Sequence, residues 1–255
     1  MKPDVTQDKN MPYRRVYFEK NQPFHILSRA IEKEYIFNEI TDCYRFIFQL
    51  YAANLGSPSP ALWRTDKIKI AQALLNGEEI SSKFIIKEHS PLVHILDFAL
   101  VKTHYHLYLL PNVENGVSFY MKKLNGGFAK YFNLRHGRKD SLFGSRYKSI
   151  PVETDFQSAA VSRYISIINP LDVYQPGWRE EGLRDSGEAF KFLENYQFSS
   201  FPDKIGKRRA KILAPDEISN RYFVTKSFKE KELYINFVKD FLRKKLISCQ
   251  PFFLE

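Results

Sequence analysis

The first half of the chain shows two kinds of apolar periodicity. Residues 23–30 alternate in the manner of a β-strand, and residues 40–55 place apolar side chains at helical spacing. A Gly-Ser-Pro-Ser-Pro breaker follows, and residues 66–76 then have the pattern of a short helix that ends at Gly77. We interpret residues 56–90 as an insertion between the first helix and the next strand.

The central part predicts a hairpin followed by a long helix. Residues 94–102 and 104–110 are rich in strand-forming side chains, and the short join at Lys102-Thr103 favours an antiparallel pair. Apolar residues from Val117 to Phe132 recur at helical spacing and stop near Gly137. The pair Gly126-Gly127 inside this helix predicts a bend or a close contact, since each glycine costs a helix about 1 kcal/mol.

The following segment predicts a strand over 142–152 and a helix over 154–168. Pro170 should end this helix, because the residue before proline avoids the α-helical region. Four apolar or aromatic residues are expected on its inner face: Phe156, Ala160, Tyr164 and Ile167.

The predicted order of strand, helix, strand, strand, helix, strand and helix indicates an α+β fold. It is the order of a ferredoxin-like antiparallel sheet with helices packed on it, plus one extra helix. We expect a polar leader over residues 1–22, a main domain over 23–200 and a basic, helical C-terminal extension over 201–255. The extension includes a last amphipathic helix with Leu233, Phe237, Val238, Phe241 and Leu242 on one face.

The net positive charge of the chain indicates which kinds of molecule it could bind. The chain carries a formal net charge of +10 and a pI near 9.4, so its surface should attract polyanions such as nucleic acids. Two distant cysteines give neither a disulfide framework nor a zinc-binding spacing, which fits a reducing cytoplasm. No apolar run approaches the roughly 18 residues of a spanning helix, so no membrane is expected.

The triplet His104-Tyr105-His106 is the most informative candidate for chemistry. On a strand, residues i and i+2 point the same way, so the two imidazoles can converge on one metal ion or phosphate. The alternative is that both histidines are ordinary, half-exposed strand residues.

Basic residues concentrate in residues 122–148, against the single acidic Asp140. Aromatic residues between them, such as Tyr131 and Tyr147, could stack on bases where single-stranded nucleic acid is held. The alternative is a solvated helix face above core aromatics. The basic residues are Lys122, Lys123, Lys130, Arg135, Arg138, Lys139, Arg146 and Lys148.

Tyr164 is a candidate nucleophile. A tyrosine on the inner face of a helix is usually a core residue, but a helix beside the histidine-bearing strand would present its hydroxyl to a metal-bound phosphate.

In order and spacing, these residues resemble the HUH endonuclease transposases that use a single tyrosine, and among them the REP-associated branch. The resemblance runs from about residue 24 to residue 206. The segments that carry it are Phe24-His25-Ile26-Leu27-Ser28-Arg29, Asp42-Cys43-Tyr44-Arg45-Phe46, His104-Tyr105-His106, Tyr131-Phe132-Asn133-Leu134-Arg135-His136-Gly137-Arg138, Leu142-Phe143-Gly144-Ser145-Arg146-Tyr147-Lys148, and Arg163-Tyr164-Ile165 leading into Asn169-Pro170.

The resemblance implies an enzyme that recognises single-stranded or hairpin DNA, cleaves it through a 5′-phosphotyrosine at Tyr164, and rejoins ends. It implies a magnesium or manganese ion bound by His104, His106 and Asn169. It further implies a homodimer that acts in the cytoplasm, on the nucleoid. Phosphate contacts are assigned to Arg29, Arg146 and Lys148, with the other basic residues of 122–148 and Tyr147 as further DNA contacts.

Two departures from the family pattern concern the site. Lys102-Thr103 stands where the family usually has Pro-Asn before its first metal histidine. The family's third ligand commonly follows the tyrosine by four positions, where this chain has Ile168, and Asn169 follows by five. On a regular helix five positions turn about 140°, so Asn169 can rejoin Tyr164 only through a π-bulge or a shift at the helix end.

Two other classes of function compete with this interpretation. The first is a catalytically inactive protein of the same fold that binds single-stranded or hairpin nucleic acid. The second is a different phosphoesterase or an RNA-processing enzyme. A two-histidine phosphoesterase would need a second His-x-Thr or His-x-Ser motif, and the sequence contains none.

Overall fold

The computed structural model describes residues 17–87, 90–144, 146–222 and 228–244, and its centre is a four-stranded antiparallel sheet. The strands are β1 (Phe24–Arg29), β4 (Val93–Val101), β5 (His104–Pro111) and β6 (Lys148–Pro151), in the order β4-β5-β1-β6. Lys102 and Thr103 form the tight turn between β4 and β5, as predicted. One long helix, together with the shorter elements of residues 56–90, lies between β1 and β4, and one long helix lies between β5 and β6, which gives the predicted ferredoxin-like topology.

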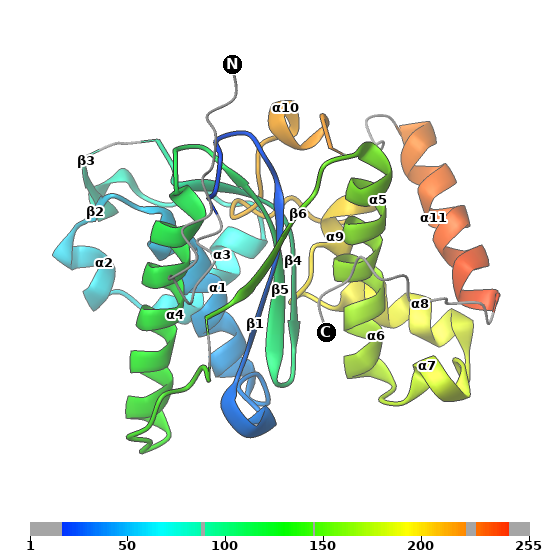
Figure 1. The fold of residues 1–255 in the computed structure, drawn as a ribbon, viewed down its shortest axis with the longest axis horizontal. Coiled ribbons are helices and arrows are strands. Elements are labelled where there is room, and N and C mark those ends of the chain that lie inside the picture. The colour runs from blue at the N-terminus through cyan, green and yellow to red at the C-terminus, as the bar shows by residue number, and fades with distance from the viewer. Residues whose placement is uncertain (1–16, 88–89, 145, 223–227, 245–255) are drawn as a thin grey trace, which may run out of the picture.

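One face of the sheet is covered by α1 (Ile40–Asn54) and α4 (Gly116–Arg135), as Figure 1 shows. Alternate β5 residues point to this face, and the ring of Tyr105 lies 4.5 Å from that of Phe46. Gly127 lets the two helices approach, because a Cβ atom there would lie 2.2 Å from the Nε2 atom of Gln49. The close contact predicted at the glycine pair is therefore confirmed.

The other face is covered by a single run of helix: α5 (Asp155–Arg163), the π-helical turn η3 (Tyr164–Ile168) and α6 (Asn169–Tyr174). The helix begins with a capping box, in which Thr154 accepts a hydrogen bond from the backbone of Gln157. Outside it lie α8 (Ser186–Asn195) and α11 (Phe228–Arg243) on the same side of the molecule (Figure 1). The sheet therefore separates two cores, and Tyr108 of β5 belongs to the second.

Three predictions about this region were wrong in detail. Pro170 does not end the helix, because it lies just after the π-helical turn, where the hydrogen-bond pattern has already changed from i+4 to i+5. Phe156 is 72% exposed, since two steps of four residues turn a helix face by about 80° away from Tyr164. The strand expected over 142–152 is shorter, with β6 starting at Lys148 and an isolated bridge at Phe143.

The remaining elements are short. Residues 56–90 contain β2 (Ser57–Pro58), α2 (Pro60–Arg64), α3 (Lys67–Leu75), η2 (Ser82–Phe84) and β3 (Ile85–Lys87), and α3 packs against α1. The others are η1 (Ile31–Lys33), α7 (Trp178–Glu181), α9 (Phe201–Lys204) and α10 (Asp216–Ser219).

Both predicted terminal segments reach beyond the described residues. Residues 1–16 of the polar leader and residues 245–255 of the C-terminal extension lie outside them. Within the described part of the extension, Lys204 pairs with the buried Asp97 at 2.8 Å and Arg208 pairs with Asp203 at 2.6 Å. The first pair holds the extension against β4, and the second lies within the extension.

Candidate active site

His104 and His106 lie on the central strand β5 and point to the face covered by the α5–η3–α6 helix. Their ring centroids are 5.1 Å apart, while Tyr105 between them is buried on the opposite face. The alternating geometry of the strand thus brings the two imidazoles together, as the sequence predicted.

Each of these histidines uses its Nδ1 atom for a contact with the protein. His104 Nδ1 lies 3.0 Å from Thr103 Oγ1, and His106 Nδ1 lies 2.9 Å from His25 Nε2. In the described part of the chain, neither Nε2 atom has a hydrogen-bond partner. The tautomers in which Nδ1–H donates to Thr103 and to His25 leave both Nε2 lone pairs for a metal ion.

Sequence reasoning missed His25. It lies on β1, which pairs with β5, and its ring stacks on that of His106 with a centroid separation of 5.2 Å. The position of His25 on a predicted strand was visible, but its pairing with His106 depends on the register between two strands that are distant in sequence.

Burial keeps the site histidines neutral. It lowers the pKa of His104 to about 3, with further lowering from the nearby charges of Arg29 and Arg179. The pKa of His106 is also well below its usual value, chiefly because of burial and then because of His25 and His104. Neutral imidazole is the form that binds a metal ion, so both residues are ready to act as ligands at neutral pH.

Tyr164 lies beside this group, at the first position of the π-helical turn. Its ring centroid is 5.4 Å from that of His106 and 5.8 Å from that of His25, and the residue is 1% exposed. The π-helical turn packs on β4 and β5, which positions the tyrosine over the sheet.

Asn169 joins Tyr164 through the π-bulge that the spacing required. The Asn169 backbone N–H donates to the Tyr164 carbonyl, an i to i+5 bond that brings the two residues one above the other. Asn169 is 1% exposed, and neither Oδ1 nor Nδ2 has a hydrogen-bond partner among the described residues. A buried amide without partners is costly, so its retention here is typical of a functional group.

Arg179 is a second residue that sequence reasoning missed, and its position gave no signal in the sequence. Its guanidinium lies 5.7 Å from the ring centroid of Tyr164 and is held by Asp172, at 2.7 Å for Nη2 to Oδ2 and 3.1 Å for Nε to Oδ1. Trp178 Nε1 donates to the same carboxylate at 2.8 Å. Burial alone would lower the Arg179 pKa, but Asp172 and a hydrogen bond with Tyr164 raise it, so the group stays cationic.

The predicted DNA contacts divide between the two sides of the sheet. Arg29 lies directly opposite His104, and Lys148 lies opposite Leu27, which in turn lies opposite His106. Residues that are directly opposite share a face, so Arg29 and Lys148 flank the histidine pair. Arg146 is exposed in the segment before β6.

The other basic candidates belong to the α4 side. Lys122, Lys123, Lys130 and Arg135 lie on α4, behind the sheet as seen from the histidines. Arg138 pairs with Glu34 at 2.6 Å, and Lys139 is exposed near the same helix end. Tyr147 is half-buried and packs near Phe18.

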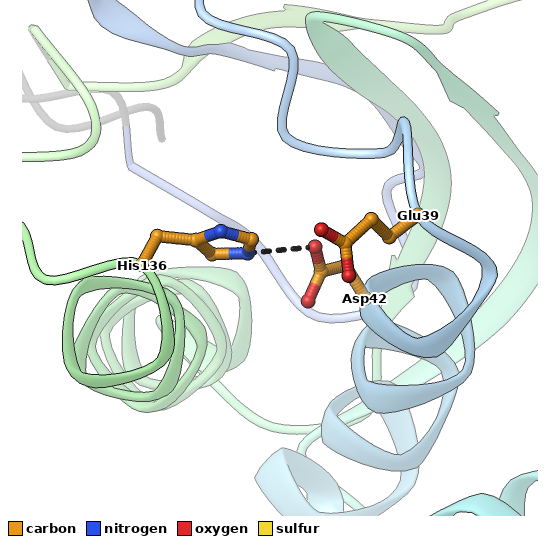
Figure 2. A group of neighbouring side chains, drawn as sticks. All are labelled: Glu39, Asp42 and His136. Carbon is orange, nitrogen blue, oxygen red and sulfur yellow. Dashed lines mark hydrogen bonds and ion pairs between the residues drawn. The ribbon is translucent and has the colours of Figure 1, made fainter.

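A second group of potential metal ligands lies at the end of α4: Glu39, Asp42 and His136, shown in Figure 2. Their ligand atoms lie within 4.8 Å of one another, so by type and spacing they could hold a metal ion. Each carboxylate is already paired, however: Asp42 with His136 at 2.9 Å and Glu39 with Arg135 at 2.7 Å. The Arg135 guanidinium beside the carboxylates supplies the positive charge that a metal ion would supply. This favours a structural role for the group, in which it joins α1 to α4.

Comparison with known proteins gives one weak structural similarity. No protein-family model matches the sequence, and no curated protein matches it. A solved structure of a REP-associated tyrosine transposase bound to a REP hairpin is similar, with a TM-score of 0.46 and 13% sequence identity, over 81% of this chain and 93% of that chain. Functional inference for this chain therefore rests on the geometry of its own site.

Among the described residues, no helix is both long and apolar enough to cross a membrane.

Proposed function

We propose that this chain is a metal-dependent endonuclease and strand transferase that acts on single-stranded or hairpin DNA through a phosphotyrosine at Tyr164. The observation that carries the proposal is that Tyr164 lies beside two neighbouring histidines on one face of the sheet, while the π-helical turn places Asn169 next to Tyr164. The Asn169 amide has no hydrogen-bond partner among the described residues. The resemblance of the sequence to single-tyrosine transposases gives the same assignment.

The residues present fit a divalent cation. His104 and His106 offer Nε2 atoms and Asn169 offers Oδ1, an oxygen with no other partner among the described residues. Imidazole nitrogens favour zinc and its neighbours, whereas an amide oxygen favours magnesium or manganese. The proposal of magnesium or manganese therefore rests on the family resemblance. Such a cation, when bound, would withdraw charge from a scissile phosphate.

Tyr164 supplies the nucleophile in this mechanism. Its oxygen gives up its proton to solvent and forms a bond to phosphorus, while the bond to the 3′-oxygen of the preceding nucleotide breaks. That oxygen takes up a proton from solvent and leaves as a hydroxyl, so the protons balance. Attack of a 3′-hydroxyl on the phosphotyrosine runs the same exchange backwards and rejoins DNA. The Arg179 guanidinium favours the ionised phenol during attack, and Asp172 holds the guanidinium in place.

Positive charge around the histidines suits a phosphate backbone. Arg29 and Lys148 flank the pair along the sheet, and Arg179 lies on the side of the helix. DNA rather than RNA as the substrate, and a homodimer as the working form, are part of the proposal and rest on the family resemblance.

The test is cleavage of fluorescent hairpin oligonucleotides in Mn²⁺ or Mg²⁺ by wild type, His106→Ala and Tyr164→Phe. Cleavage by wild type alone supports the proposal. Tight binding of hairpins by all three proteins without cleavage would instead select the inactive binding protein as the function.

A further inference from the structure

A cavity of about 780 Å³ lies on the α4 side of the molecule, behind the sheet as seen from Tyr164. Its walls come from α1, from α4 and from residues 63–68 of the segment that we interpret as an insertion. The volume is within the usual range of about 300 to 1,000 Å³ for small-molecule pockets. Four basic residues and one acidic residue line it: Arg45, Lys67, Lys130 and Arg135 against Asp66.

Arg45 lies in this wall as a desolvated cation without a counter-charge. Within the described ranges, no carboxylate pairs with it, and its Nη1 atom donates a hydrogen bond to Gln49 Oε1 at 3.0 Å. Burial lowers its pKa to about 10. A guanidinium has five N–H donors, so several are left for a ligand, and an anion would offset the cost of its burial.

The position of Arg45 is fixed by its surroundings. Its guanidinium lies 4.9 Å from the ring centroid of Phe48 and 5.0 Å from that of Tyr131. Gln49, which accepts from Arg45, is itself held by the Lys123 carbonyl at 3.2 Å, in the space that Gly127 leaves. The cation is therefore pre-positioned at the cavity rather than free to move into solvent.

Aromatic surface is available beside this charge. Trp63 is 44% exposed at the rim, and its ring meets that of Phe48 at a centroid distance of 6.0 Å. Lys67 donates a hydrogen bond to the Trp63 carbonyl, which fastens the tryptophan segment to α3. The same cavity thus offers cationic side chains for a phosphate and the Trp63 ring for a base.

We propose that this cavity binds one nucleotide unit, with its phosphate on Arg45 and Lys130 and its base stacked on Trp63. The unit could be a free mononucleotide or one residue of a single strand, since both present a base and a phosphate. The proposal is independent of the chemistry at Tyr164, because the cavity is lined by other elements on the other side of the sheet.

The experiment titrates the full chain, as wild type and as Tyr164→Phe, with deoxynucleoside 5′-monophosphates and with ten-residue oligo-dT and oligo-dA. Calorimetry and tryptophan fluorescence report binding. Deoxyadenosine, which lacks the phosphate, shows how much the phosphate adds to the affinity. Trp63→Ala should weaken binding by about tenfold, from the lost stacking. Arg45→Met keeps the side-chain bulk between Phe48 and Tyr131 and should weaken binding by about tenfold or more.

Lys69→Met is the matched control, because Lys69 is an exposed cation of α3 that does not line the cavity. A loss of affinity in Trp63→Ala and Arg45→Met, with no loss in Lys69→Met, supports the site. Tighter binding of mononucleotides or of oligonucleotides then shows whether the ligand is a free nucleotide or part of a single strand. Binding by Trp63→Ala equal to wild type, equal losses in all three variants, or no binding by wild type would overturn it. If Arg45→Met fails to fold, Trp63→Ala decides the question because Trp63 lies at the rim.

Discussion

Replacing Asn169 by leucine should stabilise the metal-free protein and at the same time remove its response to metal. Both polar atoms of the Asn169 side chain are buried without a partner among the described residues. An unpaired buried polar group costs about 1–3 kcal/mol, and leucine has the same branching at Cγ without that cost. We therefore expect Asn169→Leu to raise the free energy of unfolding by about 2 kcal/mol in EDTA.

For a chain of this size, that change corresponds to a rise in Tm of roughly 4–8 °C, measurable by scanning calorimetry. In Mn²⁺ at about 100 times its Kd, wild type should gain about 2.7 kcal/mol, whereas the variant should gain much less because it has lost a ligand. The advantage of the variant should therefore shrink or disappear when metal is added.

Asn54→Leu is the matched control for this prediction. The Asn54 amide is fully used, since Nδ2 donates to the Val93 carbonyl at 2.8 Å and Oδ1 accepts from the Val93 N–H at 3.2 Å. The same substitution should therefore destabilise the protein by about 1–3 kcal/mol. A loss of stability in Asn169→Leu under EDTA, or an undiminished response of that variant to Mn²⁺, would refute the reasoning.

Three further predictions follow from the site and its surroundings. Arg179→Met should slow single-turnover cleavage by about tenfold to a hundredfold, because the tyrosine oxygen loses its cation; an unchanged rate would exclude this role. Without metal, stability should fall as pH drops from about 6.5 toward 3: burial lowers the pKa of His25 to about 3, so the unfolded state takes up its proton first. Denaturant titrations at several pH values should show a smaller slope in His25→Phe, and an equal slope would contradict the assignment. His136→Ala should destabilise the protein by about 1–3 kcal/mol, because Asp42 loses a partner, yet leave Mn²⁺ stoichiometry in calorimetry unchanged; a lost binding site would move the metal to that cluster.

Local periodicity made much of the fold predictable. The alternation of residues 24–29 and 104–110 and the helical spacing in residues 117–132 report on which side of an element is buried, and that information lies in adjacent residues. The same rule placed His104 and His106 side by side. The strand order then followed from the sequence of elements.

The missing parts of the site depend on contacts between distant segments. His25 meets His106 only through the register of β1 against β5, and Arg179 reaches Tyr164 from a short helix beyond α6. The π-helical turn is likewise set by packing, since a regular helix would turn Asn169 away from Tyr164. Local sequence also could not tell which sheet face α4 covers, so basic residues on both sides of the sheet were predicted as DNA contacts.

The most direct test of the account is whether DNA becomes covalently attached to Tyr164. Wild type and Tyr164→Phe would be incubated with hairpin oligonucleotides and Mn²⁺, and the products examined by denaturing gel and by peptide mass spectrometry. The account predicts a protein–DNA adduct in wild type, carried by the peptide that contains Tyr164, and none in the variant. An adduct of equal yield in Tyr164→Phe, or hairpin cleavage by wild type without any adduct, would contradict it.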